Sequence, residues 1–184
     1  MFINYRLVRS SRKSIGLEIR DGELLVRAPH YATQNEIDRV IREKSSWIEK
    51  HLTESRRRKE STEQIEPLTR SELEELAQKA LEYIPERAAY YARLLGVQYK
   101  RITIRNQRTR WGSCSAKGNL NFNCILMMTP PGAIDSVVVH ELCHLKYMNH
   151  SKAFYQEIAK VFPEYDRWHR WLKENQPQLM ARLG

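Results

Sequence analysis

Along the first thirty residues, apolar positions alternate with polar ones or run in short blocks, a pattern typical of β-strands. The predicted strands cover residues 5–8, 14–20 and 23–27. Asp21-Gly22 has the composition of a hairpin turn between the last two strands, and Pro29 ends this part of the chain. The N-terminal region is therefore expected to contain β-hairpins.

Beyond this β-region the apolar spacing changes to that of helices. A capping-box pattern at Thr33 predicts a helix that runs as far as the basic stretch 56–59. A second long helix is predicted over residues 69–95, with an interruption or kink near Pro85. The polar stretch 60–68 between the two helices is expected to be a linker.

The second half of the chain mixes both patterns. Strands are predicted over residues 99–105 and 120–124, with a loop over 106–118 between them. A helix then carries an apolar stripe at helical spacing, formed by Ile134, Val138, Leu142 and Leu145. A further helix is expected to start at Ser151, which is a good N-cap residue.

These elements predict an α+β fold in one domain. A chain of 184 residues is long enough to bury a core and has the usual length of a single domain. Its expected parts are an N-terminal segment of β-hairpins and a helix (1–60), a helical segment (61–98) and a core segment (99–184).

Composition is that of a globular protein without a membrane span. Hydrophobic residues make up 41% of the sequence, yet no run of about 18 apolar residues occurs. The N-terminal stretch lacks the apolar core of a signal peptide, so a cytoplasmic location is expected. Cys114, Cys124 and Cys143 are odd in number and lack zinc-knuckle spacing, which favours buried free thiols over disulfides.

Positive charge is concentrated in one part of the chain. The formal net charge is +9, and residues 99–130 carry basic side chains but no Asp or Glu. A positive cleft concentrates anionic ligands, whereas a solvated basic surface has no such role. This segment is a candidate site for an anionic partner or substrate, with a solvated surface as the alternative.

The strongest chemical signal is HELCH at residues 140–144, an HExxH pattern that is followed by His150. Residues four apart lie about one turn apart on the same helix face, so His140 and His144 can bind one metal ion. Glu141, about 100° around the helix from His140, can reach a water on that ion. Three protein ligands and one water form the arrangement of a catalytic zinc, although another divalent metal also fits.

The third ligand has two interpretations. The helix is expected to end at Met148-Asn149, because Asn tolerates the left-handed conformation just past a C-terminus. The chain would then turn back and present His150. Alternatively, a downstream carboxylate, Glu157 or Glu164, completes a site of two histidines and one glutamate.

Other short motifs surround the HExxH pattern. They are RWGSCS at 110–115, LNFN at 120–123, Pro130, and NHS at 149–151 with Phe154. Together they resemble the YgjP-like family of zinc metallopeptidases, which is related to the SprT-like and WLM proteases of the zincin group. The similarity is specific over residues 100–165 and extends to the N-terminal β-region and Trp47. The metzincin pattern is disfavoured, because Tyr147 stands where its glycine would be.

The resemblance implies a zincin-like architecture, with a small mixed sheet beside the HExxH helix. It implies His140, His144 and His150 as metal ligands and Glu141 as general base. In zincins an edge strand pairs with an extended substrate, and residues 119–123 are the candidate for that strand. Candidate substrate contacts are Arg110, Asn121, Asn123 and Tyr147, of which Arg110 and Tyr147 are also candidate oxyanion donors.

Three functions fit these residues. The first and favoured one is a zinc metallopeptidase that uses a metal-bound water activated by Glu141. The second is a nucleoside triphosphate pyrophosphatase, because a divalent metal and arginines also suit phosphate oxygens. The third is a nucleic-acid-binding module with a structural metal. No nucleic-acid-binding motif occurs, however, and a structural zinc normally uses four protein ligands.

Overall fold

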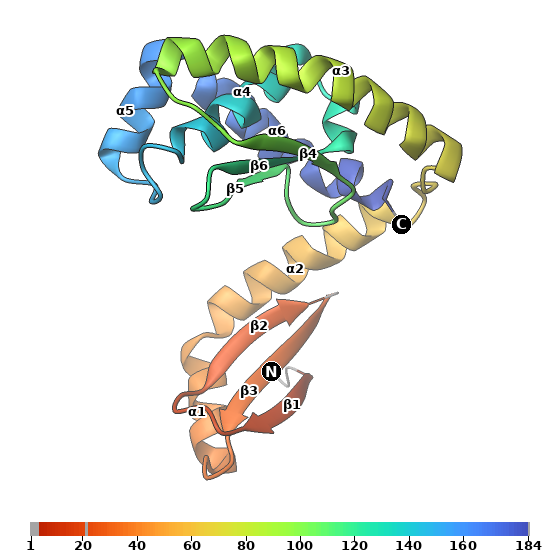
Figure 1. The fold of residues 1–184 in the computed structure, drawn as a ribbon. Helices are drawn as coiled ribbons and strands as arrows, with labels where there is room; N and C mark the ends of the chain where they lie inside the picture. The colour runs from red at the N-terminus through yellow and green to blue at the C-terminus, as the bar shows by residue number, and fades with distance from the viewer. Residues whose placement is uncertain (1–3, 21, 184) are drawn as a thin grey trace. The chain divides into compact units, whose positions relative to one another are not determined.

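A computed structural model describes residues 4–20 and 22–183, and the chain forms two compact units (Figure 1). The first unit spans Met1–Gln64 and the second spans Ile65–Gly184. The boundary falls inside the polar stretch 60–68 that the sequence marks as a linker. The expectation of one domain for the whole chain stays a prediction.

The first unit contains a three-stranded sheet in the order β1-β3-β2. Its strands are β1 (Tyr5–Ser10), β2 (Gly16–Arg20) and β3 (Glu23–Pro29). β2 and β3 are antiparallel, and Gly22 between them has a φ of 81°, which suits a tight turn. The other residue of the predicted turn, Asp21, lies outside the described residues. β1 pairs in parallel with β3, so it is not part of a hairpin.

Two helices, α1 (Gln34–Glu43) and α2 (Ser45–Thr62), complete the core of this unit. The capping box predicted at Thr33 is present. The predicted single helix is broken at Lys44, whose N–H bonds to two carbonyl oxygens of α1. Both helices therefore bury apolar side chains together with the sheet. The main core residues are Leu24, Val26, Ala28, Ile37, Ile41 and Ile48.

The second unit has its own sheet in the order β4-β6-β5. Its strands are β4 (Arg101–Arg105), β5 (Gly112–Cys114) and β6 (Asn119–Asn123). β5 lies inside the stretch 106–118 that the sequence predicts as a loop. Because β6 is paired in parallel with β4 and antiparallel with β5, the prediction that residues 119–123 form an edge strand is wrong.

Helices lie along one side of this second sheet (Figure 1). They are α3 (Arg70–Leu95), the 3-10 helix η1 (Cys124–Met128), α4 (Pro131–Cys143), α5 (Lys152–Val161) and α6 (Tyr165–Ala181). α3 is a single helix through Pro85, without the predicted interruption. The predicted α+β fold, with a small mixed sheet beside the HExxH helix, is confirmed. Across the described residues, no helix has the length and apolar character needed to cross a membrane.

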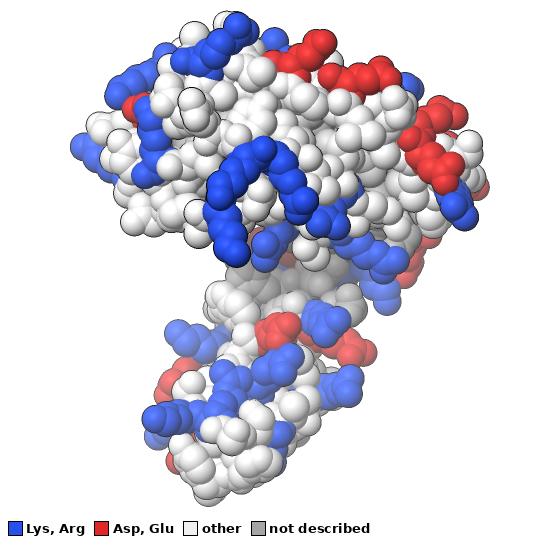
Figure 2. Space-filling view, in the orientation of Figure 1, with Lys and Arg blue, Asp and Glu red and all other residues white. Residues whose placement is uncertain are grey.

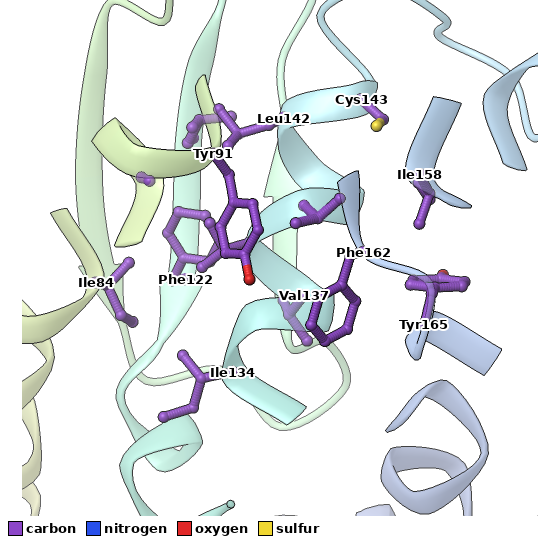
Figure 3. Packing of buried hydrophobic residues seen from close by; sticks show 14 of the residues in the cluster. Ile84, Tyr91, Phe122, Ile134, Val137, Leu142, Cys143, Ile158, Phe162 and Tyr165 are labelled. Carbon is purple, nitrogen blue, oxygen red and sulfur yellow. The ribbon is translucent and has the colours of Figure 1, made fainter. Parts of the chain in front are cut away.

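α4 is surrounded by the core of the second unit (Figure 3). Every residue from 133 to 139 is buried, as are Leu142 and Cys143. Tyr91 of α3 and Phe122 of β6 pack into the same cluster. A helix that is apolar over most of its surface is held from several sides at once. The three cysteines are free thiols; Cys124 and Cys143 are buried as predicted, whereas Cys114 is only partly buried.

A polar contact also holds α4 against α3. The guanidinium of Arg87 donates to both carboxylate oxygens of Asp135, at 2.7 Å each. The hydroxyl of Tyr91 donates to the same carboxylate at 3.1 Å. Asp135 is buried, so these contacts balance a charge that water cannot solvate. Because Asp135 and His140 share α4, the contact helps to fix the helix that carries the HExxH pattern.

Asp135→Asn keeps the side-chain shape but removes the charge opposite Arg87. We expect the free energy of unfolding to fall by about 1–3 kcal/mol, because a charge-assisted bidentate contact is lost. The control is Glu74→Gln, which breaks the exposed Arg70–Glu74 pair and should cost less than about 0.5 kcal/mol. Chemical denaturation measures both values. Equal effects would show that the Arg87–Asp135 pair does not hold the two helices together.

Candidate metal centre

The end of α4 brings the predicted metal ligands together. Nε2 of His144 lies 3.2 Å from Nε2 of His140, and Nε2 of His150 lies 3.1 Å from the same atom. Candidate ligand atoms of all three histidines lie within 4.8 Å of one another. Two nitrogens that share a tetrahedral zinc ion are about 3.3 Å apart, so the three imidazoles have the spacing of a common metal site.

His150 reaches this position because α4 ends early. The last helical residue is Cys143, and the prediction of an end at Met148-Asn149 is wrong. The backbone N–H groups of residues 146 and 147 both bond to the carbonyl oxygen of Cys143, which closes a tight turn. After this turn the chain brings His150 back to His140 within a few residues.

Phe154 lies against all three imidazoles. Its ring centroid is 5.0 Å from that of His140, 4.8 Å from that of His144 and 5.0 Å from that of His150. The ring is fully buried. Ser151 caps α5, as predicted, by accepting a hydrogen bond from the N–H of Phe154. This cap fixes the start of α5, and with it the position of the Phe154 ring against the three candidate ligands.

The outer ring nitrogens orient the imidazoles. Nδ1 of His144 lies 3.0 Å from the carbonyl oxygen of Tyr147, which can only accept, so this nitrogen carries the proton. Nδ1 of His140 lies 2.8 Å from the hydroxyl of Tyr165. Burial, assisted by the neighbouring histidines, lowers the pKa of His140 to about 3 and keeps it neutral. Neutral imidazoles with converging Nε2 lone pairs fit a divalent metal such as zinc.

The two rival carboxylates are engaged elsewhere. Glu157 accepts hydrogen bonds from two lysines, at 2.5 and 2.8 Å. Glu164 forms an exposed ion pair with Arg167 at 3.2 Å. The structure thus groups His150, and neither carboxylate, with the two histidines of the HExxH pattern.

Glu141 is 6% exposed and lies against the backbone of β5. A Cβ atom on Gly112 would lie 2.8 Å from Cγ and 2.9 Å from Oε1 of Glu141, so this approach requires glycine. Burial raises the pKa of Glu141 to about 8, and the positive charge of Arg110 opposes that rise. A buried carboxyl with such a pKa, beside a metal site, is a candidate general base.

A cavity of about 220 Å³ opens beside Glu141. Trp111 and Gly112 lie at one side of it, and α4 and α6 form its walls. The residues that α6 contributes are Tyr165, His169, Leu172, Lys173 and Gln176. A substrate group in this cavity would therefore meet apolar walls, several polar side chains and the candidate general base.

Two of the predicted substrate contacts lie on the loop before β5 and at the end of β6. Arg110 is exposed and close enough to Glu141 to affect its pKa. Asn123 is 1% exposed, and its amide donates to the carbonyl oxygens of Gln107 and Arg110. Asn123 thus holds the loop that carries Arg110, a position that does not expose its amide to a substrate.

The other two predicted contacts are partly buried. Asn121 donates from its amide to the hydroxyl of Ser113 on the neighbouring strand, at 3.2 Å. Tyr147 contributes its backbone carbonyl to the site, through the contact with His144. Its ring packs against the core of the second unit. Roles for either side chain in binding substrate stay predictions.

Basic side chains gather over the sheet of the second unit, whereas acidic side chains gather along α3 (Figure 2). The segment 99–130, which the sequence marks as basic, contains β4, β5, β6 and their connecting loops. The candidate metal centre therefore belongs to the same unit as the most one-sided basic segment of the chain.

Three contributors to the site do not stand out in the sequence. Gly112 and His169 lie outside the HExxH pattern, and neither has a spacing that indicates a metal ligand. Tyr165 contacts His140 across 25 residues of sequence, and its hydroxyl also lies 3.3 Å from Nδ1 of His169. The one available signal is that Tyr165 and His169 are four residues apart on a helix, so they share a face.

Comparisons with known proteins found a matching family and several similar proteins. The family described as YgjP-like, metallopeptidase domain, matches residues 13–75 and 68–175. A curated UTP pyrophosphatase of Escherichia coli (strain K12) is 36% identical over 58 residues, which are 32% of this chain. The alignment spans 35% of that protein, well short of its full length.

Two solved structures are similar over half of the chain. One is the metallopeptidase zymogen of Pyrococcus abyssi abylysin, with 25% identity, a TM-score of 0.46, and coverage of 50% of this chain and 95% of that one. The other is the zymogen of Methanocaldococcus jannaschii jannalysin, with 21% identity, a TM-score of 0.46, and coverage of 50% and 96%.

Purified protein should retain about one equivalent of divalent metal per chain, because three imidazoles converge on one point. His140→Ala and His144→Ala should abolish retention, and His150→Ala should weaken it strongly. Glu157→Ala and Glu164→Ala serve as controls and should retain the metal. Elemental analysis after gel filtration measures each variant. Metal loss in Glu164→Ala with retention in His150→Ala would assign the third ligand to the carboxylate.

Gly112→Ala places a methyl group 2.8 Å from Cγ of Glu141, so that side chain must move. We expect unchanged metal content but about 100-fold lower hydrolytic turnover, because a displacement near 1 Å of a reacting group has that effect. Thr109→Ala, at an exposed position in the loop before β5, is the control and should keep its turnover. Full activity of Gly112→Ala would show that the position of Glu141 against β5 is unimportant.

Proposed function

Because the chain belongs to the YgjP-like metallopeptidase family, we propose that it hydrolyses peptide bonds with one bound zinc ion. The observation that carries this proposal is the convergence of three imidazole Nε2 atoms beside a buried carboxyl. A zinc ion held by His140, His144 and His150 would supply a Lewis acid that polarises a carbonyl and acidifies water. Another divalent metal suits the same ligands.

Glu141 is the proposed general base. It takes a proton from the attacking water and returns it to the leaving amine. Burial raises its pKa to about 8 in the metal-free protein. A divalent cation held by the neighbouring histidines would lower that pKa again and favour the carboxylate form that accepts the proton. Its contact with the backbone of Gly112 holds the carboxyl oxygens in place, so little rearrangement is needed before proton transfer.

The edge strand β5 supports a peptide substrate. The carbonyl of Trp111 accepts from the N–H of Asn123, and the N–H of Ser115 donates to the carbonyl of Asn119. Since bonding alternates along an antiparallel pair, the backbone groups of Gly112 and Cys114 point away from β6. An extended peptide can add to that edge by main-chain pairing. This edge, next to Glu141, replaces the strand 119–123 that the sequence favours.

A nucleotide phosphoanhydride is the second candidate substrate. The basic segment 99–130 and the position of Lys173 and His169 in the cavity beside Glu141 both suit phosphate oxygens. The curated relative that is named a UTP pyrophosphatase adds support, limited to the 58 residues aligned. The third hypothesis, a nucleic-acid-binding module with a structural metal, is not retained, because the family consists of metallohydrolases.

The zinc-loaded protein should be assayed in parallel against unfolded protein substrates and a panel of nucleoside triphosphates, with Glu141→Gln as the blank. We expect the wild type to cleave peptide bonds. Glu141→Gln should keep its metal but lose about 100-fold to 10,000-fold in turnover, because an amide cannot accept the proton. Nucleotide hydrolysis without peptide cleavage would contradict the peptidase proposal and favour the second candidate.

Arg110→Ala separates the two substrates further, with Arg108→Ala as an exposed control from the same loop. For a phosphoanhydride, loss of Arg110 should raise KM or lower kcat strongly, because a charged contact to phosphate is removed. For a neutral peptide bond the loss should be modest. Peptide cleavage that is indifferent to Arg110→Ala, with no nucleotide hydrolysis, would remove the phosphate hypothesis.

A further inference from the structure

Tyr165, the first residue of α6, connects a candidate metal ligand to the cavity. Its hydroxyl lies 2.8 Å from Nδ1 of His140 and 3.3 Å from Nδ1 of His169. Its ring lies nearly parallel to both imidazoles, with interplanar angles of 14° and 21°. The residue is 4% exposed, whereas His169 is exposed and lines the cavity beside Glu141.

The position of the proton on His140 determines which group donates in each of these hydrogen bonds. A neutral imidazole that binds a metal through Nε2 must carry its proton on Nδ1. With a metal bound at Nε2, Nδ1 of His140 would therefore donate to the oxygen of Tyr165. The hydroxyl hydrogen of Tyr165 is then free to be donated to Nδ1 of His169, which accepts it.

The position of α6 is held by a separate close contact. A Cβ atom on Gly132, near the start of α4, would lie 2.3 Å from the ring of Trp168. Glycine at this position lets the indole of α6 pack directly on α4. Because Trp168 and Tyr165 are three residues apart on α6, this packing sets where the Tyr165 hydroxyl lies relative to His140.

We propose that Tyr165 and His169 form an outer layer of the metal centre that positions His140 for metal binding. The inference rests on the proposed metal site. A hydrogen bond to the second nitrogen of a ligating imidazole fixes its tautomer and ring orientation, and it raises the affinity for metal. Packing alone would need only the aromatic ring of Tyr165, whereas positioning needs its hydroxyl group.

Tyr165→Phe keeps the ring and removes the hydroxyl group. We expect the zinc dissociation constant, measured by competition with a chromogenic chelator, to rise about 10-fold to 100-fold. The control is Tyr155→Phe, whose ring also lies near the site, 6.3 Å from that of His150, and it should leave zinc affinity unchanged. His169→Ala should weaken zinc binding less than Tyr165→Phe, because it acts on His140 only through Tyr165.

Nitrogen-15 NMR of the histidine rings reports which ring nitrogen carries a proton, which a packing role alone would not determine. In the zinc-loaded protein, Nδ1 of His140 should carry a proton and Nδ1 of His169 should not. Tyr165→Phe should alter the His169 signals while thermal stability stays close to that of the wild type.

Two results would overturn the inference in different ways. Wild-type protein that binds zinc tightly, together with Tyr165→Phe of equal affinity and unchanged histidine signals, would remove the positioning role and leave the metal centre intact. Wild-type protein that binds no zinc would remove the proposed metal centre itself, and this inference with it.

Discussion

The candidate site depends on the near-complete burial of α4. Residues 133–139 of this helix are all in the core, and Asp135 is clamped by Arg87 from α3. A helix enclosed in this way has no freedom to rotate about its axis. His140 and Glu141 near the end of the helix, and His144 just past it, are therefore held in fixed positions.

Elements far apart in the sequence contact the side chains at the C-terminal end of α4 and complete the candidate site. β5 brings the backbone of Gly112 against Glu141, α5 brings Phe154 beneath the imidazoles, and α6 brings Tyr165 to His140. Each of these contacts limits the movement of a side chain that would take part in the chemistry. Such supporting contacts hold reacting groups in productive positions, so that binding energy need not be used to arrange them.

The sequence predicts those features that depend on short-range spacing. Helical periodicity and the HExxH pattern identify the metal helix, and the N-caps at Thr33 and Ser151 are found where local chemistry places them. Prediction from the sequence fails for features that depend on tertiary contacts. β5 has three residues and no alternating pattern, so only its pairing with β6 reveals it. The contact between Tyr165 and His140 likewise depends on how α6 packs on α4.

Hydrolysis of a peptide bond and hydrolysis of a nucleotide phosphoanhydride would need the same metal and the same base, so the metal centre suits both substrates. The open edge of β5 suits an extended peptide, and the basic residues around the cavity suit phosphate. Both candidates share the claim that three imidazoles of this chain hold one catalytic metal ion. That claim therefore comes before any assignment of substrate.

X-ray absorption spectroscopy at the zinc edge tests this claim most directly. The zinc-loaded protein should show three imidazole nitrogens and one oxygen from water around each ion, which is the ligand set of a catalytic site with an open position. Sulfur scattering would place the metal on cysteines. A spectrum with fewer than three imidazoles would show that His140, His144 and His150 do not act together, and either result would contradict the account.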